Sequence, residues 1–120
     1  MIVGLHHAQI TIPLGTEEAG KEFYCKVLGL NEISKPSALQ GRGGFWLQVG
    51  NQEVHVGTEE GFNRLTTKAH LAYEVEDISY WKKVLMEHDI EILDSVPIPH
   101  YERFEFRDPF GNRVEMIQPI

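Results

Sequence analysis

The sequence predicts an α+β fold of two βαβββ modules, which together form a curved mixed sheet with the helices outside. Segments with the two-residue periodicity of strands alternate with two segments of helical periodicity. The order of segments along residues 1–60 is repeated along residues 66–120. A chain of 120 residues with 42% hydrophobic content suits one compact domain, so both modules are expected to belong to it.

The first module contains four predicted strands, at residues 5–12, 30–35, 45–49 and 53–56. Thr16 is placed to cap a helix that follows the first strand, and Gly29 is placed to end it. A polar, glycine-rich loop covers residues 36–44. The last two strands should form a hairpin, because Gly50 and Asn51 favour a tight turn between them.

The second module repeats this order, with predicted strands at residues 70–75, 90–93, 103–107 and 113–117. Asp77 can cap its helix, in which Trp81 occupies a core position by helical spacing. The run DPFGN at residues 108–112 is sufficiently explained as the turn before the last strand. Asp108 is therefore given no catalytic role.

Four side chains of the kinds that bind metals occupy matching slots in the two modules. His7 and His70 take one slot in the first strands, and His55 and Glu115 take another in the last strands. Strand alternation sends all four to the polar side of the sheet, whereas it sends His6 to the apolar side, where a structural role is expected. The polar side is predicted to carry His7, Gln9, Thr11, Gln48, His55, His70, Glu74, Glu105, Arg107 and Glu115.

This pattern favours a metal site. A single histidine on a strand is more often structural, but imidazole and carboxylate groups gathered on one face are the donors that first-row divalent ions prefer. His88 and His100 have no counterparts in the repeat, so solvated positions are expected for both.

Composition excludes several other classes of function. The net charge of −7 is spread among interspersed acidic and basic residues, which gives no surface for a nucleic-acid backbone. No apolar run is long enough to span a membrane and no leader pattern is seen, so a cytoplasmic protein is expected. Cys25 is the single cysteine and lies in an apolar helical pattern, which predicts an inert thiol.

Four motifs give the chain a family resemblance: LHHAQI at 5–10, FYCKVLGL at 23–30, HLAYEV at 70–75 and FRDPFGNRVE at 106–115. Together they resemble the glyoxalase/bleomycin-resistance/extradiol-dioxygenase superfamily, also called the vicinal oxygen chelate proteins. The resemblance covers nearly the whole chain. It implies the glyoxalase/bleomycin-resistance fold, a homodimer, and one divalent metal per site, which is Zn, Ni, Co, Mn or Fe.

The resemblance carries the family's metal ligands over to His7, His70 and Glu115. The fourth slot falls on His55, where glyoxalase I enzymes usually have Glu. The activity implied is that of a glyoxalase-like lyase or isomerase, whose small substrate chelates the metal through neighbouring oxygens and can be a thiol adduct. Glu115 is the first candidate for the base that moves the proton, with Glu74 and Glu105 as the others. The candidates for substrate binding are Gln9, Thr11, Gln48, Trp46 and Arg107.

Three alternatives remain open within the same resemblance. An extradiol-type dioxygenase also uses two histidines and one carboxylate, although such enzymes are generally longer. A bleomycin-resistance-like binding protein would have no metal, and the three retained ligand types argue against it. A fosfomycin thiol transferase is least favoured, because residues 95–103 lack its cation loop and Glu105 stands where that group usually has Tyr.

Overall fold

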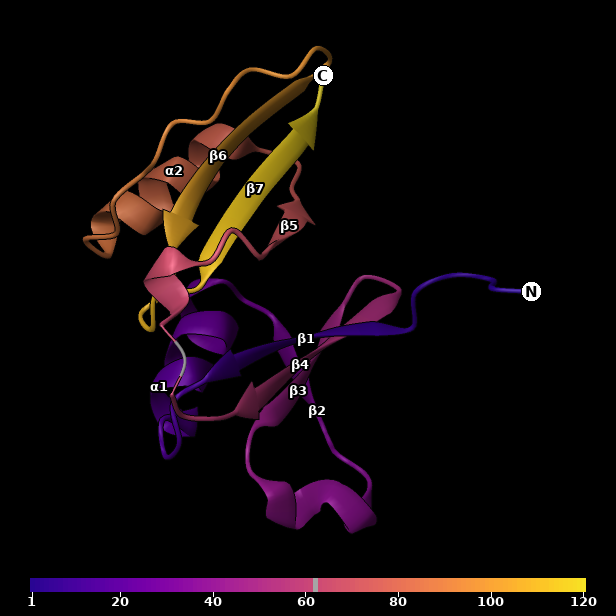
Figure 1. Cartoon of the computed structure of the whole chain (residues 1–120). Coiled ribbons are helices and arrows are strands. Elements are labelled where there is room, and N and C mark those ends of the chain that lie inside the picture. Colours follow the sequence, from indigo (N-terminus) through magenta and orange to yellow (C-terminus); the bar gives the residue numbers. More distant parts are fainter. Residues whose placement is uncertain (62) are drawn as a thin grey trace. The chain divides into compact units, whose positions relative to one another are not determined.

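The computed structural model describes residues 1–61 and 63–120 and divides into two compact units, Met1–Phe62 and Asn63–Ile120. Each unit contains one mixed β-sheet and its own helical segments (Figure 1). The predicted α+β class and the two βαβββ-like modules are therefore confirmed. In the part of the chain that is described, no helix has the length and apolar character needed to cross a membrane.

The first unit has a four-stranded sheet in the order β1-β4-β3-β2. Its strands are β1 (His7–Ile12), β2 (Asn31–Ile33), β3 (Phe45–Val49) and β4 (Gln52–Thr58). β1 runs parallel to β4, and β3 and β4 form the predicted hairpin. Buried apolar residues, including Ile12, Leu47 and Val56, form the core of this unit. Gly20 lets the helix approach closely, because a Cβ there would lie only 2.9 Å from the ring of Phe45.

The helical segment of the first unit differs from the prediction in two ways. It begins as α1 (Glu17–Lys21) but continues as a π-helix, η1 (Glu22–Val27). Thr16 does not cap it through its side chain, because the hydroxyl donates backward to the carbonyl of Pro13 at 2.6 Å. The predicted loop at residues 36–44 also contains a short 3-10 helix, η2 (Ser37–Arg42).

The second unit has a three-stranded sheet in the order β5-β7-β6. Its elements are η3 (Arg64–Thr66), β5 (His70–Glu74), α2 (Ile78–Glu87), β6 (Tyr101–Arg107) and β7 (Arg113–Pro119). The prediction that Asp77 caps α2 is confirmed, since its Oδ1 accepts a hydrogen bond from the backbone N–H of Tyr80 at 3.0 Å. Lys82 places its Nζ 5.8 Å from the centroid of the Phe104 ring, which sets α2 against the apolar face of this sheet.

The strand predicted at residues 90–93 does not form. Only Leu93 joins the sheet, through two backbone hydrogen bonds with Glu105 at 2.8 and 3.0 Å. Two residues later the Ser95 hydroxyl donates to the Glu105 carboxylate, so the contact with β6 at this point is made by side chains and no longer by the backbone. The pairing thus ends after a single bridge.

The placement of His6 is also corrected. The first strand was expected from residue 5, but its ladder starts with the pairing of His7 with Glu53. His6 therefore lies outside the strand and is exposed, so strand alternation does not direct it to the apolar side. Its Nδ1 lies 3.0 Å from Nδ1 of His7.

Candidate metal centre and substrate pocket

Strand register places the predicted ligand slots equivalently in the two units. In the first unit, Gln9 of β1 pairs with His55 of β4, two positions beyond the pairing of His7. In the second unit, Ala72 of β5 pairs with Glu115 of β7, two positions beyond the pairing of His70. Each first-strand histidine is thus diagonal to the last-strand donor of the same unit, on the same face of a parallel pair.

In the first unit the aromatic side chains of this face form a stack. The His7 and His55 rings have centroids 4.1 Å apart and an interplanar angle of 15°, and the Trp46 and His55 rings are 3.7 Å apart at 4°. His55 is held between them and is buried. Its Nε2 lies 2.9 Å from Oε1 of Glu53, and this hydrogen bond lowers the pKa of the Glu53 carboxyl. His55 is therefore fixed both by stacking and by a carboxylate partner.

In the second unit a histidine and a carboxylate face each other directly. Nε2 of His70 lies 3.2 Å from Oε1 of Glu115, whose side chain is only 7% exposed. Nδ1 of His70 lies 3.0 Å from the carbonyl oxygen of Lys68. Because a carbonyl oxygen can only accept, Nδ1 must carry a proton. In the neutral tautomer the lone pair then lies on Nε2, the nitrogen that faces the carboxylate.

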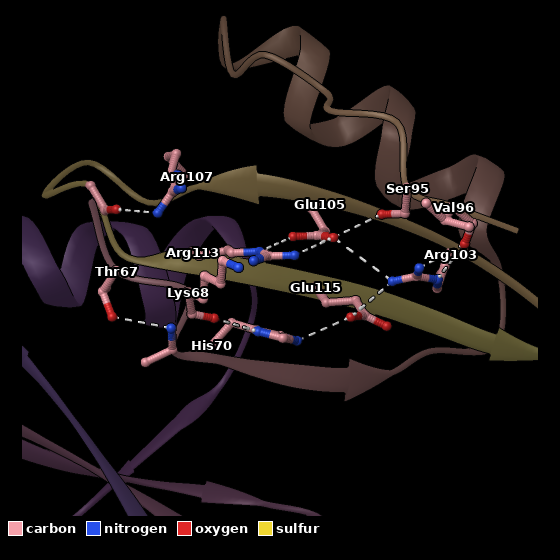
Figure 2. A network of polar contacts seen from close by, with 12 residues as sticks. Thr67, Lys68, His70, Ser95, Val96, Arg103, Glu105, Arg107, Arg113 and Glu115 are labelled. Atoms are coloured by element: carbon pink, nitrogen blue, oxygen red, sulfur yellow. Dashed lines mark hydrogen bonds and ion pairs between the residues drawn. The ribbon is translucent and has the colours of Figure 1, made fainter. Parts of the chain in front are cut away.

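Arg103 connects this pair to a second carboxylate, Glu105, which Arg113 also binds (Figure 2). Nη1 of Arg103 lies 3.3 Å from Glu115 and 3.7 Å from Glu105, while its other nitrogens donate to the carbonyl of Val96. Arg113 binds Glu105 through Nε and, at 2.8 Å, through Nη2. The Arg113 hydrogen bonds lower the pKa of the Glu105 carboxyl to about 2 against the opposing effect of burial. Glu105 is thus a stable carboxylate and a weak base.

Of the remaining predicted residues, some bond to nearby protein groups or are exposed, and others line a pocket. Thr11 donates to Glu59 at 2.8 Å, Gln48 donates to the carbonyls of Gly50 and Gln52, and Arg107 donates to the carbonyls of Arg64 and Gly111. Glu74 is exposed at the end of β5. By contrast, Gln9 and Trp46 lie together with His7 and His55 around one pocket.

This pocket belongs entirely to the first unit and has a volume of about 420 Å³. Its wall includes the histidines His7 and His55, and its rim includes Lys35 and Arg42 from the segment around η2. The pocket brings the stacked rings and two cationic side chains to one place.

Sequence reasoning missed four cationic residues of these sites. Arg103 and Arg113 share a face with Glu105 and Glu115, and strict alternation along RFEFR and RVE would have indicated this. Lys35 and Arg42 carried no comparable signal, because they flank a loop whose path depends on tertiary contacts.

Neither unit by itself gathers a complete set of metal ligands. Within the described ranges, no three His, Cys, Asp or Glu side chains cluster closely enough to hold an ion. Each unit carries one pair of the predicted slots, and imidazole and carboxylate are donor types that divalent metals accept.

Comparison with known proteins gives a consistent family signal. The family model described as Glyoxalase/Bleomycin resistance protein/Dioxygenase superfamily matches residues 4–116. A solved structure from Bacillus anthracis, assigned to the glyoxalase family, is 41% identical with a TM-score of 0.92, covering 100% of this chain and 98% of that one. Among curated proteins, no sequence matches.

Two solved structures of lower identity share the fold. A fosfomycin resistance protein from Listeria monocytogenes, in complex with Mn(II) and sulfate, is 14% identical with a TM-score of 0.77, covering 100% of this chain and 93% of that one. A lactoylglutathione lyase from Agrobacterium tumefaciens is 18% identical with a TM-score of 0.72, covering 96% and 92%.

Proposed function

Because this chain belongs to the glyoxalase/bleomycin resistance protein/dioxygenase superfamily, we propose that it is a divalent-metal-dependent lyase or isomerase of the glyoxalase type. Its substrate is a small molecule that presents two neighbouring oxygens to the metal. His7, His70 and Glu115 are the proposed ligands, with His55 as a fourth candidate. The proposed assembly is a homodimer.

The arrangement of His70 supports the proposal most directly. Its Nδ1–H donates a hydrogen bond to the carbonyl of Lys68, and its Nε2 faces the buried Glu115 carboxylate at 3.2 Å. Metal-binding histidines typically have their second ring nitrogen anchored in this way, which fixes the tautomer and aims the free lone pair. Two acceptors that face each other need either a second proton on the ring or a cation, and a divalent metal meets that need.

A bound metal would act as a Lewis acid that polarises a substrate carbonyl and stabilises the negative charge formed when the adjacent proton leaves. Glu115 is the proposed base for that proton. Arg113 makes Glu105 a weaker base by lowering the pKa of its carboxyl to about 2. The proposed role of Glu105 is therefore to hold Arg103 and Arg113 in position. Arg103 in turn contacts Glu115, which keeps that carboxylate directed along the strand face.

Metal loading tests the proposal. Protein stripped with a chelator is loaded separately with Zn²⁺, Ni²⁺, Co²⁺, Mn²⁺ and Fe²⁺, and bound metal is measured. We expect stoichiometric binding in the wild type and its loss in His7→Ala, His70→Ala and Glu115→Ala. His88→Ala and His100→Ala are matched controls, because both histidines are exposed and outside the strands. Circular dichroism checks that every variant folds.

Activity is then measured on the hemithioacetals of methylglyoxal with glutathione or bacillithiol, and on a catechol panel with oxygen. Turnover of a hemithioacetal by the loaded protein supports the glyoxalase assignment, whereas ring cleavage of a catechol transfers the assignment to a dioxygenase. If the wild type binds none of the five metals, the proposal is wrong and a binding protein takes its place.

A further inference from the structure

The pocket of the first unit differs in charge from the chain as a whole. The protein carries a net charge of −7, with 18 acidic side chains against 11 basic ones. The residues that line the pocket nevertheless include Lys35 and Arg42, and none of these lining residues is Asp or Glu. A concave site with cations and no lining carboxylate attracts anions, because low-dielectric walls strengthen the local field.

The loop that carries these cations is held in place by its own hydrogen bonds. Nζ of Lys35 donates to the carbonyl of Gly43 at 2.6 Å, and Nε2 of Gln40 donates to the carbonyl of Lys35 at 3.1 Å. The chain then returns to β3 through Gly44, whose φ is +76° and where a Cβ would lie 2.2 Å from the carbonyl oxygen of Val56. Only glycine fits there, so the loop is fixed close to β4.

Both cations retain donors for a ligand. An ammonium group has three N–H bonds, and Gly43 accepts only one from Lys35. Arg42 is exposed at the rim and has five guanidinium N–H bonds in a fork that matches an oxyanion. The carboxylate of Glu17 also faces this loop, but it accepts a hydrogen bond from the Gly44 N–H at 3.1 Å, which lowers its pKa.

Apolar and aromatic side chains form part of the remaining wall, beside the polar Gln9 and Thr58. Leu39 and Val56 contribute aliphatic surface, and Trp46 contributes the outer ring of the stack that contains His55. A site of about 420 Å³ with a partly apolar wall and two cations among its lining residues suits a small organic molecule with one charged end.

We propose that this pocket binds the substrate as a small organic anion, with its oxyanion between Lys35 and Arg42 and its apolar body against Leu39 and Trp46. The inference rests on the proposed function, because His7 lines the same pocket and would place the reacting oxygens beside the metal. The oxyanion is a carboxylate or a phosphate, both of which offer the same acceptor chemistry to these donors.

Three probes of similar shape test the charge requirement: benzoate, phenyl phosphate and neutral benzamide. Binding is followed by calorimetry and by the NMR signal of the Trp46 indole N–H, which a Trp46→Phe variant assigns. We expect both anions to bind at least about tenfold more tightly than benzamide, which corresponds to one charge-assisted hydrogen bond. The tighter of the two anions identifies the substrate's acid group.

Variants test the residues. Lys35→Gln and Arg42→Gln should each weaken benzoate binding about tenfold. Lys26→Gln is the matched control and should have no effect, because Lys26 pairs with Glu22 on the exposed face of η1. Equal binding of benzamide and benzoate, or wild-type affinity in both pocket variants, would overturn the inference.

The same titrations are repeated on chelator-treated protein to separate this inference from the metal proposal. If the protein takes up no metal but still binds the anions more tightly than benzamide, the proposed function is wrong and the pocket assignment stands. Full metal binding without any preference for the anions overturns the pocket assignment alone.

Discussion

Nε2 of His70 lies 3.2 Å from Oε1 of Glu115, and the two residues come from parallel strands whose register makes them diagonal neighbours. The equivalent diagonal in the other unit brings the rings of His7 and His55 to a centroid distance of 4.1 Å. The repeat in the sequence is thus also a repeat in geometry, although one diagonal joins a histidine to a carboxylate and the other is an aromatic stack.

The Glu115→Gln substitution tests the first of these diagonals. It preserves the shape of the side chain but removes the negative charge and one acceptor, so we expect affinity for divalent metal to fall at least about tenfold. Isothermal titration with Mn²⁺ or Ni²⁺ measures this. Glu102→Gln, on the same sheet but exposed, should bind metal like the wild type. Unchanged affinity in Glu115→Gln would remove Glu115 from the ligand set.

The Glu105 carboxylate should make stability depend on pH at the acid end. Its pKa of about 2 in the folded state lies below the ordinary value of 4.5, so the stabilisation is fully present above the unfolded pKa. It is lost as the pH falls from about 4.5 toward 2. At pH 7 we expect Glu105→Gln to lower the free energy of unfolding by about 2 kcal/mol, because a buried charge-assisted pair is broken.

Urea denaturation at pH 7 and at pH 3 measures this difference between wild type and Glu105→Gln. The difference in unfolding free energy between wild type and Glu105→Gln should be smaller at pH 3 than at pH 7. Glu102→Gln should have the same unfolding free energy as the wild type at both pH values. An equal difference in unfolding free energy at both pH values would mean that the charge of the Glu105 carboxylate contributes nothing to stability.

Two glycines that flank β3, Gly44 before it and Gly50 after it, distinguish the cost of backbone strain from that of steric clash. Both have positive φ, +76° at Gly44 and +58° at Gly50, but a Cβ meets the Val56 carbonyl at Gly44 and nothing within 4 Å at Gly50. We expect Gly50→Ala to cost about 1 kcal/mol and Gly44→Ala at least about 3 kcal/mol. Thermal denaturation of the two variants compares them, and equal losses would contradict the close approach of the loop to β4.

Tyr73 offers a substitution that should stabilise the protein. Its ring is buried, and its hydroxyl has no hydrogen-bond partner among the described residues. Burial raises the pKa of this hydroxyl. Tyr73→Phe removes an unsatisfied polar atom while keeping the ring, so we expect unfolding free energy to rise by about 1 kcal/mol. Differential scanning calorimetry measures it, with the exposed Tyr80→Phe as control; a loss of stability would show that the hydroxyl has a role.

Periodicity and local chemistry were enough to predict most elements of the fold. Alternation identified β1, β3, β4, β5, β6 and β7, and the Asp77 cap located the start of α2. These features depend on neighbours in the sequence and on which face is buried, so the sequence carries them directly. The strand expected at residues 90–93 was wrong, because a weakly alternating segment forms a ladder only if its partner continues to pair with it.

The candidate site also has some features that local sequence specifies and others that depend on tertiary contacts. By itself, the sequence determined the superfamily, the two repeated modules and the matching slots of His7, His70, His55 and Glu115, because strand alternation and repeat order are properties of the chain. Only the tertiary structure decided which partners these side chains have: the Lys68 carbonyl that sets the tautomer of His70, the two rings that enclose His55, and the arginines beside Glu105 and Glu115. It also brought Lys35 and Arg42 to the pocket. Such contacts join residues that are distant in sequence, and they depend on strand register and loop path, which no local pattern specifies.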